Sequence, residues 1–248
     1  MRKTINKMCI MLLTLVLTLT MFAPLTALAE ETQSSSSSTV TITFNPNGGS
    51  GGGTRWLTPG QQFGTLPTAN RANHVFLGWF TSSTGGQQIQ PTDLVPHNDA
   101  TYWAHWGQIQ SKTLSHTGSM MIMGMPPLTT NSNWISFNGN TIPANSIITS
   151  ISVNTGSSTM SGVIMGNNLQ ILSSAGGNTL IIPWNGANNS VLNDSTHFTG
   201  LPARATYTIR WNGTVISGTP GNIFNPNPTD AIRGYSNVKL TINYIVMP

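Results

Sequence analysis

Alternation of apolar and polar residues dominates this chain and predicts strands. Val40, Ile42 and Phe44 alternate with threonines, and the same period of two recurs at 207–211 and 238–246. Weaker strand signals lie at 134–137, 147–153, 163–165, 169–172 and 180–184, and Gly, Asn and Pro separate them. Short strands divided by turn residues are typical of an antiparallel sandwich or jelly roll. We therefore expect an all-β protein.

The composition supports this expectation. Only 6% of the residues are charged, whereas an ordinary globular domain has about 25%. Asparagine, serine and threonine take their place, and these residues compete with helical backbone hydrogen bonds. The composition thus excludes a coiled coil or a helix bundle.

The first 29 residues have the pattern of a secretory signal peptide. A basic start is followed by an apolar stretch at 10–22 and by the small-residue cleavage motif Ala27-Leu28-Ala29. The apolar stretch is shorter than the roughly 20 residues of a membrane-spanning helix. We expect residues 1–29 to be removed, which leaves a secreted protein without stable membrane insertion and with a Ser-rich linker at 30–38. We expect the product to be extracellular, either released or held at the cell surface by noncovalent contacts.

Cleavage changes the charge and the thiol content of the chain. The formal net charge of +4 includes Arg2, Lys3 and Lys7, and the single cysteine, Cys9, lies in the same leader. Without them, seven basic residues face six acidic ones and no thiol remains. A nearly neutral chain has no basic surface for phosphates, so we expect no nucleic-acid partner.

An ordered set of motifs covers residues 39–107. A strand at 39–44 is followed by Asn47-Gly48-Gly49, by Leu66-Pro67, by a Gly-Trp strand at 76–80 and by an aromatic strand at 101–106. This order resembles the Listeria–Bacteroides repeat, the B-repeat type of module found in bacterial surface proteins such as internalins. The resemblance implies a small β-grasp-like module at 39–107. We expect a linker at 108–119 and a β-sandwich domain at 120–248, for which no family is recognised.

Catalytic residue types are scarce in the predicted mature chain. Asp194 and Asp230 are the only carboxylates of the second domain, and His197 lies close to Asp194 in sequence. Their polar, turn-like surroundings favour capping or solvated loop roles, although a hydrolase site around these three residues is an alternative. The histidines lack the spacing of zinc sites, so we expect no metal and no cofactor.

Aromatic residues are the stronger binding candidates. In the module, Trp103 and His105 occupy alternate positions of one strand and share a face that we expect to be partly wet. In the second domain, a platform for neutral glycans could combine aromatic rings with the abundant Asn side chains, because amides supply both donors and acceptors. Packing in the core is the competing role for each ring. The aromatic candidates of the second domain are Trp134, Trp184, Trp211 and Tyr235.

These patterns favour a secreted bacterial, cell-surface-associated adhesion or interaction protein that acts by binding and not by catalysis. One alternative is a carbohydrate-binding module that uses exposed Trp and Asn residues of the sandwich. The other is the extracellular hydrolase. The expected partner is an extracellular protein or a glycan, and the sequence does not predict the oligomeric state.

Overall fold

A computed structural model describes residues 38–218 and 230–247. The predicted signal peptide at 1–29 and nearly all of the predicted linker at 30–38 lie outside these residues. All regular secondary structure in the described ranges is β-strand, as the alternation predicts. No part of them forms a helix that could cross a membrane.

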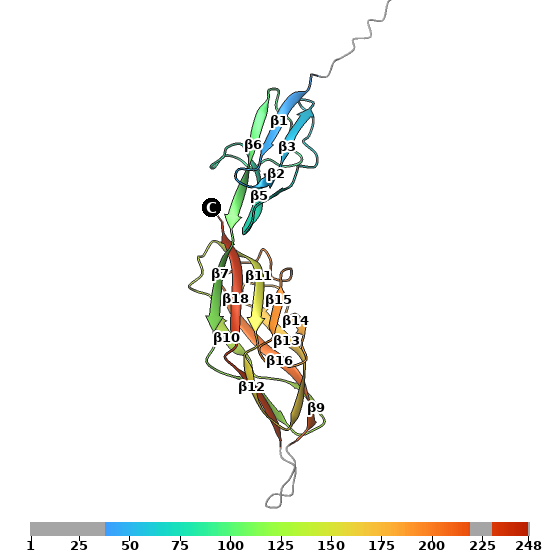
Figure 1. The fold of residues 1–248 in the computed structure, drawn as a ribbon, viewed down its shortest axis with the longest axis vertical. Coiled ribbons are helices and arrows are strands. Elements are labelled where there is room, and N and C mark those ends of the chain that lie inside the picture. The colour runs from blue at the N-terminus through green and yellow to red at the C-terminus, as the bar shows by residue number, and fades with distance from the viewer. Residues whose placement is uncertain (1–37, 219–229, 248) are drawn as a thin grey trace, which may run out of the picture. The chain divides into compact units, whose positions relative to one another are not determined.

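The module at 39–107 is built on a four-stranded mixed sheet with the order β3-β1-β6-β5 (Figure 1). β1 and β6 pair in parallel at its centre, and both outer pairs are antiparallel. The strands of this sheet are β1 (Val40–Asn45), β3 (Gly53–Leu57), β5 (His74–Phe80) and β6 (Ala100–Gln108). A two-stranded ribbon, β2 (Ser50–Gly51) with β4 (Ala69–Asn70), completes the module.

One face of this sheet forms the module core. Ile42 and Phe44 of β1 lie there beside Trp79 and Tyr102, and the connecting segments add Phe63 and two further apolar residues, Ile89 and Val95. The ring of Phe44 meets that of Trp79 edge to face, with centroids 5.1 Å apart. Because side chains alternate along a strand, the threonines of β1 lie on the opposite face.

A tight turn before β3 depends on glycine. Gly52 has φ = +76°, and a Cβ added there would collide with the Phe44 carbonyl oxygen and lie 2.9 Å from Cη2 of Trp79. We expect Gly52→Ala to lower the local stability of the module by about 2–3 kcal/mol. Amide hydrogen exchange of β1 and β3 measures this loss.

Gly60 is the matched control for this substitution. Its φ is also positive, at +75°, but no atom lies within 4 Å of an added Cβ. Gly60→Ala therefore introduces backbone strain without a collision and should cost about 1 kcal/mol. Equal losses in the two variants would contradict the assigned contact.

The second domain is a β-sandwich made of three sheets (Figure 1). The largest has the order β10-β16-β13-β14, with β9 also paired to β16, and the others have the orders β15-β11-β18-β7 and β12-β17-β8. The strands of the largest sheet are β9 (Leu128–Asn131), β10 (Ile135–Asn138), β13 (Val163–Ser173), β14 (Leu180–Pro183) and β16 (Thr206–Ser217). Those of the smaller sheets are β7 (Gln110–Ser115), β11 (Ser146–Asn154), β15 (Val191–Asp194), β18 (Lys239–Val246), β8 (Met120–Gly124), β12 (Ser157–Ser161) and β17 (Ala231–Ser236).

The predicted linker at 108–119 is corrected by this topology. Residues 110–115 form β7, which pairs antiparallel with β18 at the edge of its sheet. The sequence of β7 is polar, and Leu114 is its only buried apolar residue. An edge strand with a single inward apolar residue lacks the repeated alternation by which a strand is recognised.

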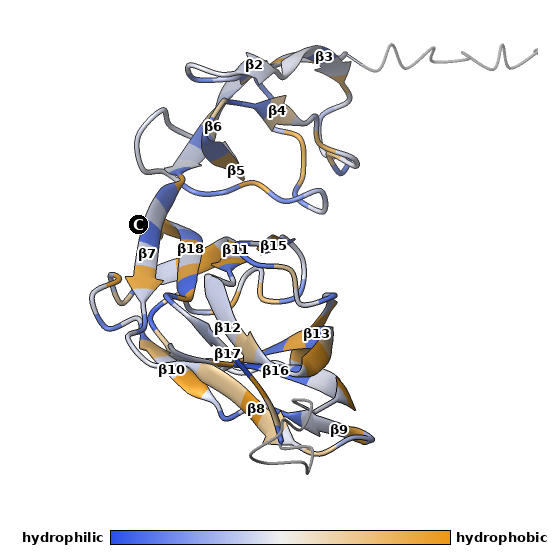
Figure 2. Cartoon of the chain, turned by 60° about the horizontal axis from the view of Figure 1, so that its bottom comes forward, coloured by the Kyte–Doolittle hydropathy of each residue, from blue (hydrophilic) through white to orange (hydrophobic). Residues whose placement is uncertain are grey.

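Inward-facing residues of all three sheets form one core cluster. The alternation that the sequence predicts is visible in Figure 2 as bands of opposite hydropathy along β11 and β18. Along β16, Tyr207, Ile209 and Trp211 are buried, while Thr208 and Arg210 lie on the outer face. This division places Trp211 on the core face of the sheet and Arg210 on its outer face.

Tyr207 should make the sandwich sensitive to high pH. Its hydroxyl is buried and donates to the carbonyl oxygen of Ala203 at 2.7 Å. Burial raises the pKa of this hydroxyl well above its ordinary value, and it also raises that of Tyr235 to about 12. As the pH rises above about 10, the unfolded chain loses the phenolic protons first, and the free energy of unfolding must decrease.

We expect urea midpoints to fall between pH 10 and 12, and Tyr207→Phe to reduce the steepness of that fall. At neutral pH this variant should be slightly less stable, because the Ala203 carbonyl loses its donor. An identical pH dependence in the two proteins would contradict the role given to Tyr207.

Candidate functional site

A continuous row of amide side chains covers the outer face of the largest sandwich sheet. In the strand register, Asn212 of β16 is paired with Asn168 of β13 on one side and with Asn131 of β9 on the other. The next register pair on the same face of β13 and β16 is Gln170 with Arg210. We call this surface the amide face; it comprises Asn131, Trp134, Asn168, Gln170, Arg210 and Asn212.

Hydrogen bonds join the side chains of the amide face to one another. The Nδ2 of Asn212 donates to Oδ1 of Asn131 at 3.0 Å, and Nε2 of Gln170 donates to Oδ1 of Asn168 at 3.1 Å. The network continues along β13 and β16, where Nδ2 of Asn167 donates to Oδ1 of Asn212 at 2.8 Å. Such mutual bonds hold the amides in fixed orientations while each keeps further donors or acceptors for a ligand.

Trp134 ends this network on the side of β10. The residue directly precedes β10, and 39% of its side chain is exposed. The Arg210 guanidinium lies 4.3 Å from the centre of the indole ring, and Nε of Arg210 donates to Oε1 of Gln170 at 2.8 Å. An aromatic ring, a cation and a row of amides are therefore joined on one face.

The other aromatic candidates of this domain do not belong to that surface. Trp184, Trp211 and Tyr235 are buried, with Trp211 and Tyr235 fully inaccessible. The Trp211 ring meets that of Tyr235 edge to face at 5.2 Å, and its Nε1 donates to the Met120 carbonyl oxygen at 3.1 Å. These three rings are core residues, and the predicted aromatic platform is corrected to Trp134 alone.

The outer face of the module sheet is a second candidate surface. Trp103 and His105 of β6 share this face, as predicted, and both are half-buried. His105 is occupied within the module, because its ring stacks on that of Phe80 at 3.9 Å and its Nε2 lies 2.9 Å from the Ser82 carbonyl oxygen. Trp103 lies beside Phe80 in the register of β5 and β6.

Sequence analysis did not find the most exposed aromatic residue of this face. Trp56 on edge strand β3 is 71% exposed and lies opposite Thr41 of β1. Beside it is a shallow hollow of about 220 Å³, lined by Thr41, Thr43, Asp99, Ala100 and Thr101. The pattern of glycines and polar residues around Trp56 gave no strand signal. The only available hint was a tryptophan in otherwise polar sequence.

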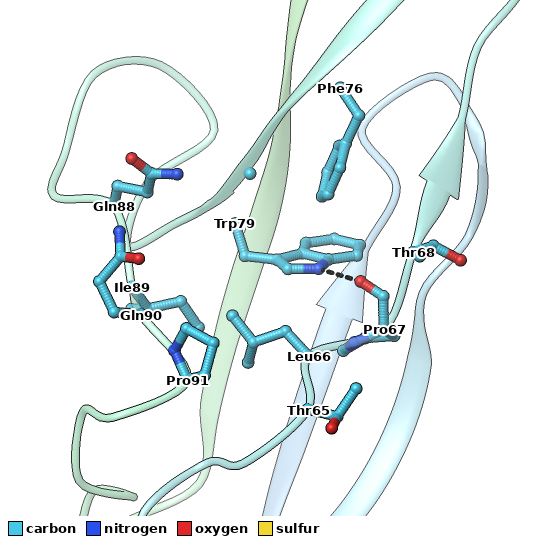
Figure 3. Close-up of a pocket in the computed structure, with 11 residues that line it drawn as sticks. Thr65, Leu66, Pro67, Thr68, Phe76, Trp79, Gln88, Ile89, Gln90 and Pro91 are labelled. Carbon is cyan, nitrogen blue, oxygen red and sulfur yellow. Dashed lines mark hydrogen bonds between the residues drawn. The ribbon is translucent and has the colours of Figure 1, made fainter.

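A hollow of about 410 Å³ lies against the core of the module (Figure 3). The indole of Trp79 forms its floor and donates from Nε1 to the Pro67 carbonyl oxygen at 2.7 Å. Around it lie Phe76, Leu66 and the segment from Gln88 to Pro91, and no charged side chain lines it. Because Trp79 itself is buried, this hollow is best explained as packing of the connecting segments over the sheet.

The residues of the predicted hydrolase alternative meet only in part. Asp194 accepts from the backbone N–H of His197 at 2.9 Å and from the Thr196 hydroxyl at 3.2 Å, so its carboxylate stabilises a local turn. The His197 ring is directed elsewhere, with Nε2 at 2.7 Å from the Asn178 carbonyl oxygen. Asp230 is exposed just before β17 and shares no hydrogen bond with either residue. In the described ranges, no three His, Cys, Asp or Glu side chains are grouped so as to hold a metal.

Comparison with known proteins identifies the first module. Residues 41–105 match the family model of the Listeria-Bacteroides repeat domain, and the predicted resemblance is thereby confirmed. The chain contains this repeat within the sheet of β1, β3, β5 and β6. No curated protein matches the sequence. Because the repeat is typical of extracellular and surface proteins, it indicates a protein of that kind.

Solved structures that are similar to the chain include that of FLHE. It has 12% sequence identity to this chain, and the match covers 55% of this chain and 97% of FLHE. The TM-score is 0.31. A similarity of this size carries no argument about the fold or the function of the sandwich.

Proposed function

We propose that this protein is secreted, associates with the bacterial surface and acts by binding a glycan on the amide face of its sandwich. The observation that carries the proposal is the hydrogen-bonded amide network that ends at the exposed Trp134. The Listeria-Bacteroides repeat supports an extracellular setting, in which glycans are abundant ligands.

The chemistry of the amide face suits a polyhydroxylated ligand. A sugar presents hydroxyls around its ring and C–H groups on the faces of the ring. Asparagine and glutamine supply both donors and acceptors for the hydroxyls, and an indole ring covers the apolar face. Since neighbouring amides and Arg210 already hold Gln170 in place, little side-chain entropy is lost on binding.

A panel of soluble polysaccharides tests this proposal. The secreted protein is titrated with neutral and acidic members, and binding is followed by tryptophan fluorescence and calorimetry. We expect saturable binding of at least one member, with a change in Trp134 emission because its ring is accessible. Absence of binding across the whole panel would refute a glycan ligand.

A second function, adhesion to an extracellular protein, is favoured by one observation in the module. Trp56 is 71% exposed on an edge strand, and exposed tryptophans beside a free sheet edge are suited to protein contacts. In cell and matrix binding assays, Trp56→Ala should then reduce retention of the protein. Because the predicted mature chain is nearly neutral, such binding should depend weakly on salt.

A further inference from the structure

The Arg210 guanidinium is held at the centre of the amide face by two contacts. Its Nε donates to Oε1 of Gln170 at 2.8 Å, and its Cζ lies over the Trp134 ring, 4.3 Å from the ring centre. The stem emerges from the middle of β16, with Ile209 and Trp211 on either side buried in the core. The charged group is therefore fixed from below by the strand and from the sides by two neighbouring residues.

The two Nη atoms of Arg210 keep their hydrogen-bonding capacity. In the part of the chain that the structure describes, neither atom has a hydrogen-bond acceptor and no carboxylate pairs with the guanidinium. Asp194 is engaged in its own turn by Thr196 and His197. The remainder of the amide face is neutral, so Arg210 provides its one charge.

Such a group has a definite chemical preference. A guanidinium offers two parallel N–H groups that match the two oxygens of a carboxylate, and this bidentate pair is stronger than a bond between neutral groups. Stacking on an indole ring leaves the edge of the guanidinium available while removing water from its face. We infer that Arg210, seated on Trp134, binds the carboxylate of an acidic sugar, and that the glycan of the proposed function carries uronic or sialic acid residues.

The surroundings of Arg210 favour a sugar acid over an acidic peptide or a sulfated chain. Gln170 is paired with Arg210 in the strand register, and Asn212 follows two residues later on the same face of β16. Their NH₂ groups already donate within the sheet, so their amide oxygens remain to accept from hydroxyls next to the carboxylate. A densely sulfated ligand requires a cluster of cations, whereas this face has one. A single cation among amides is complementary to a ligand with one carboxylate for several hydroxyls.

Matched ligand pairs test this inference, which rests on the proposed function. The pairs are trigalacturonic acid with its carboxyl-reduced form, and 3′-sialyllactose with lactose. Calorimetry measures the affinity of the secreted wild-type protein and of Arg210→Gln for each member. In at least one pair, we expect wild-type protein to bind the acidic member about tenfold more tightly, and Arg210→Gln to abolish that preference because it lowers affinity for the acidic member more than for the neutral one.

Lys239→Gln is the control for the change in net charge. Lys239 is exposed on β18, in a different sheet from the amide face, and its replacement should leave the preference intact. Equal binding of both members by wild-type protein, or a preference that survives in Arg210→Gln, would overturn the carboxylate site and leave glycan binding standing. Binding of neither member of either pair, or Arg210-dependent binding of an acidic peptide in their place, would overturn the inference, and the polysaccharide panel decides separately whether the protein binds a glycan.

Discussion

Replacing Trp211 with alanine should lower the free energy of unfolding of the sandwich by about 3–5 kcal/mol. The side chain is fully buried and packs against Trp184 and Tyr235, with ring centroids 6.2 and 5.2 Å away. Its removal leaves a cavity among aromatic rings and also deprives the Met120 carbonyl oxygen of its Nε1 donor. Urea unfolding, followed by the far-UV signal of the sheets, measures the loss.

Trp134→Ala is the matched control for that experiment. The same side chain is deleted from the outer face of the same sheet, where 39% of it is exposed and one guanidinium is its charged neighbour. We expect a loss of less than about 1 kcal/mol. If Trp134→Ala were as destabilising as Trp211→Ala, the division of this sheet into a core face and an outer face would be wrong.

The second large effect concerns binding. Trp134→Ala should weaken glycan binding about 30-fold, because truncation of an aromatic residue that dominates a binding surface costs about 2 kcal/mol. The variant also removes the ring that supports Arg210, so both the stacking surface and the cation lose their positions. Calorimetric titration with the tightest-binding polysaccharide of the panel measures the change.

Two further variants separate stacking from general damage. Trp134→Phe keeps an aromatic ring and should recover part of the affinity, while Trp56→Ala removes a more exposed tryptophan from the module and should leave glycan affinity unchanged. If glycan affinity were lost in Trp56→Ala and retained in Trp134→Ala, the binding site would lie in the module and not on the amide face.

The alternation in the sequence at 207–211 predicted which of these residues of β16 share a face of the sheet. Alternation from Tyr207 to Trp211 puts Tyr207, Ile209 and Trp211 on one face and Arg210 on the other. Alternation alone does not indicate which of the two faces is buried, and the prediction of Trp211 as a platform residue was wrong. The period of two thus separated Trp211 from Arg210, whereas the burial of the ring follows from the packing of the sheets.

The amide face itself could not be read from the sequence. Gln170 lies 39 residues and Asn212 81 residues from Asn131 along the chain, and their contacts depend on strand order and register. β9 pairs with β16, and β13 pairs with β16 through two register shifts. Single-sequence patterns determine neither, because polar residues on an outer face do not constrain which strand lies beside them. Asparagine abundance was the one available signal, and it did not indicate which asparagines meet.

In the module, the family motifs predicted the positions of the strands more accurately than the alternation of apolar and polar residues did. The motif order gave the aromatic strand that contains Trp103 and His105, and both residues lie on the expected face. The partners of His105, by contrast, are the ring of Phe80 at the end of the Gly-Trp strand and the carbonyl oxygen of Ser82 just beyond it, and the motifs do not indicate either contact. Its role is therefore structural support for the end of β5, which only the folded arrangement reveals.

Nuclear magnetic resonance of the side-chain amides tests the central claim most directly. During titration with the tightest-binding glycan, the NH₂ signals of Asn131, Asn168, Gln170 and Asn212 should shift together with the indole N–H of Trp134. The indole signals of Trp56, Trp103 and the buried Trp211 should remain in place. Shifts confined to the module, with unchanged amide signals on β9, β13 and β16, would contradict the assignment of the amide face as the binding surface.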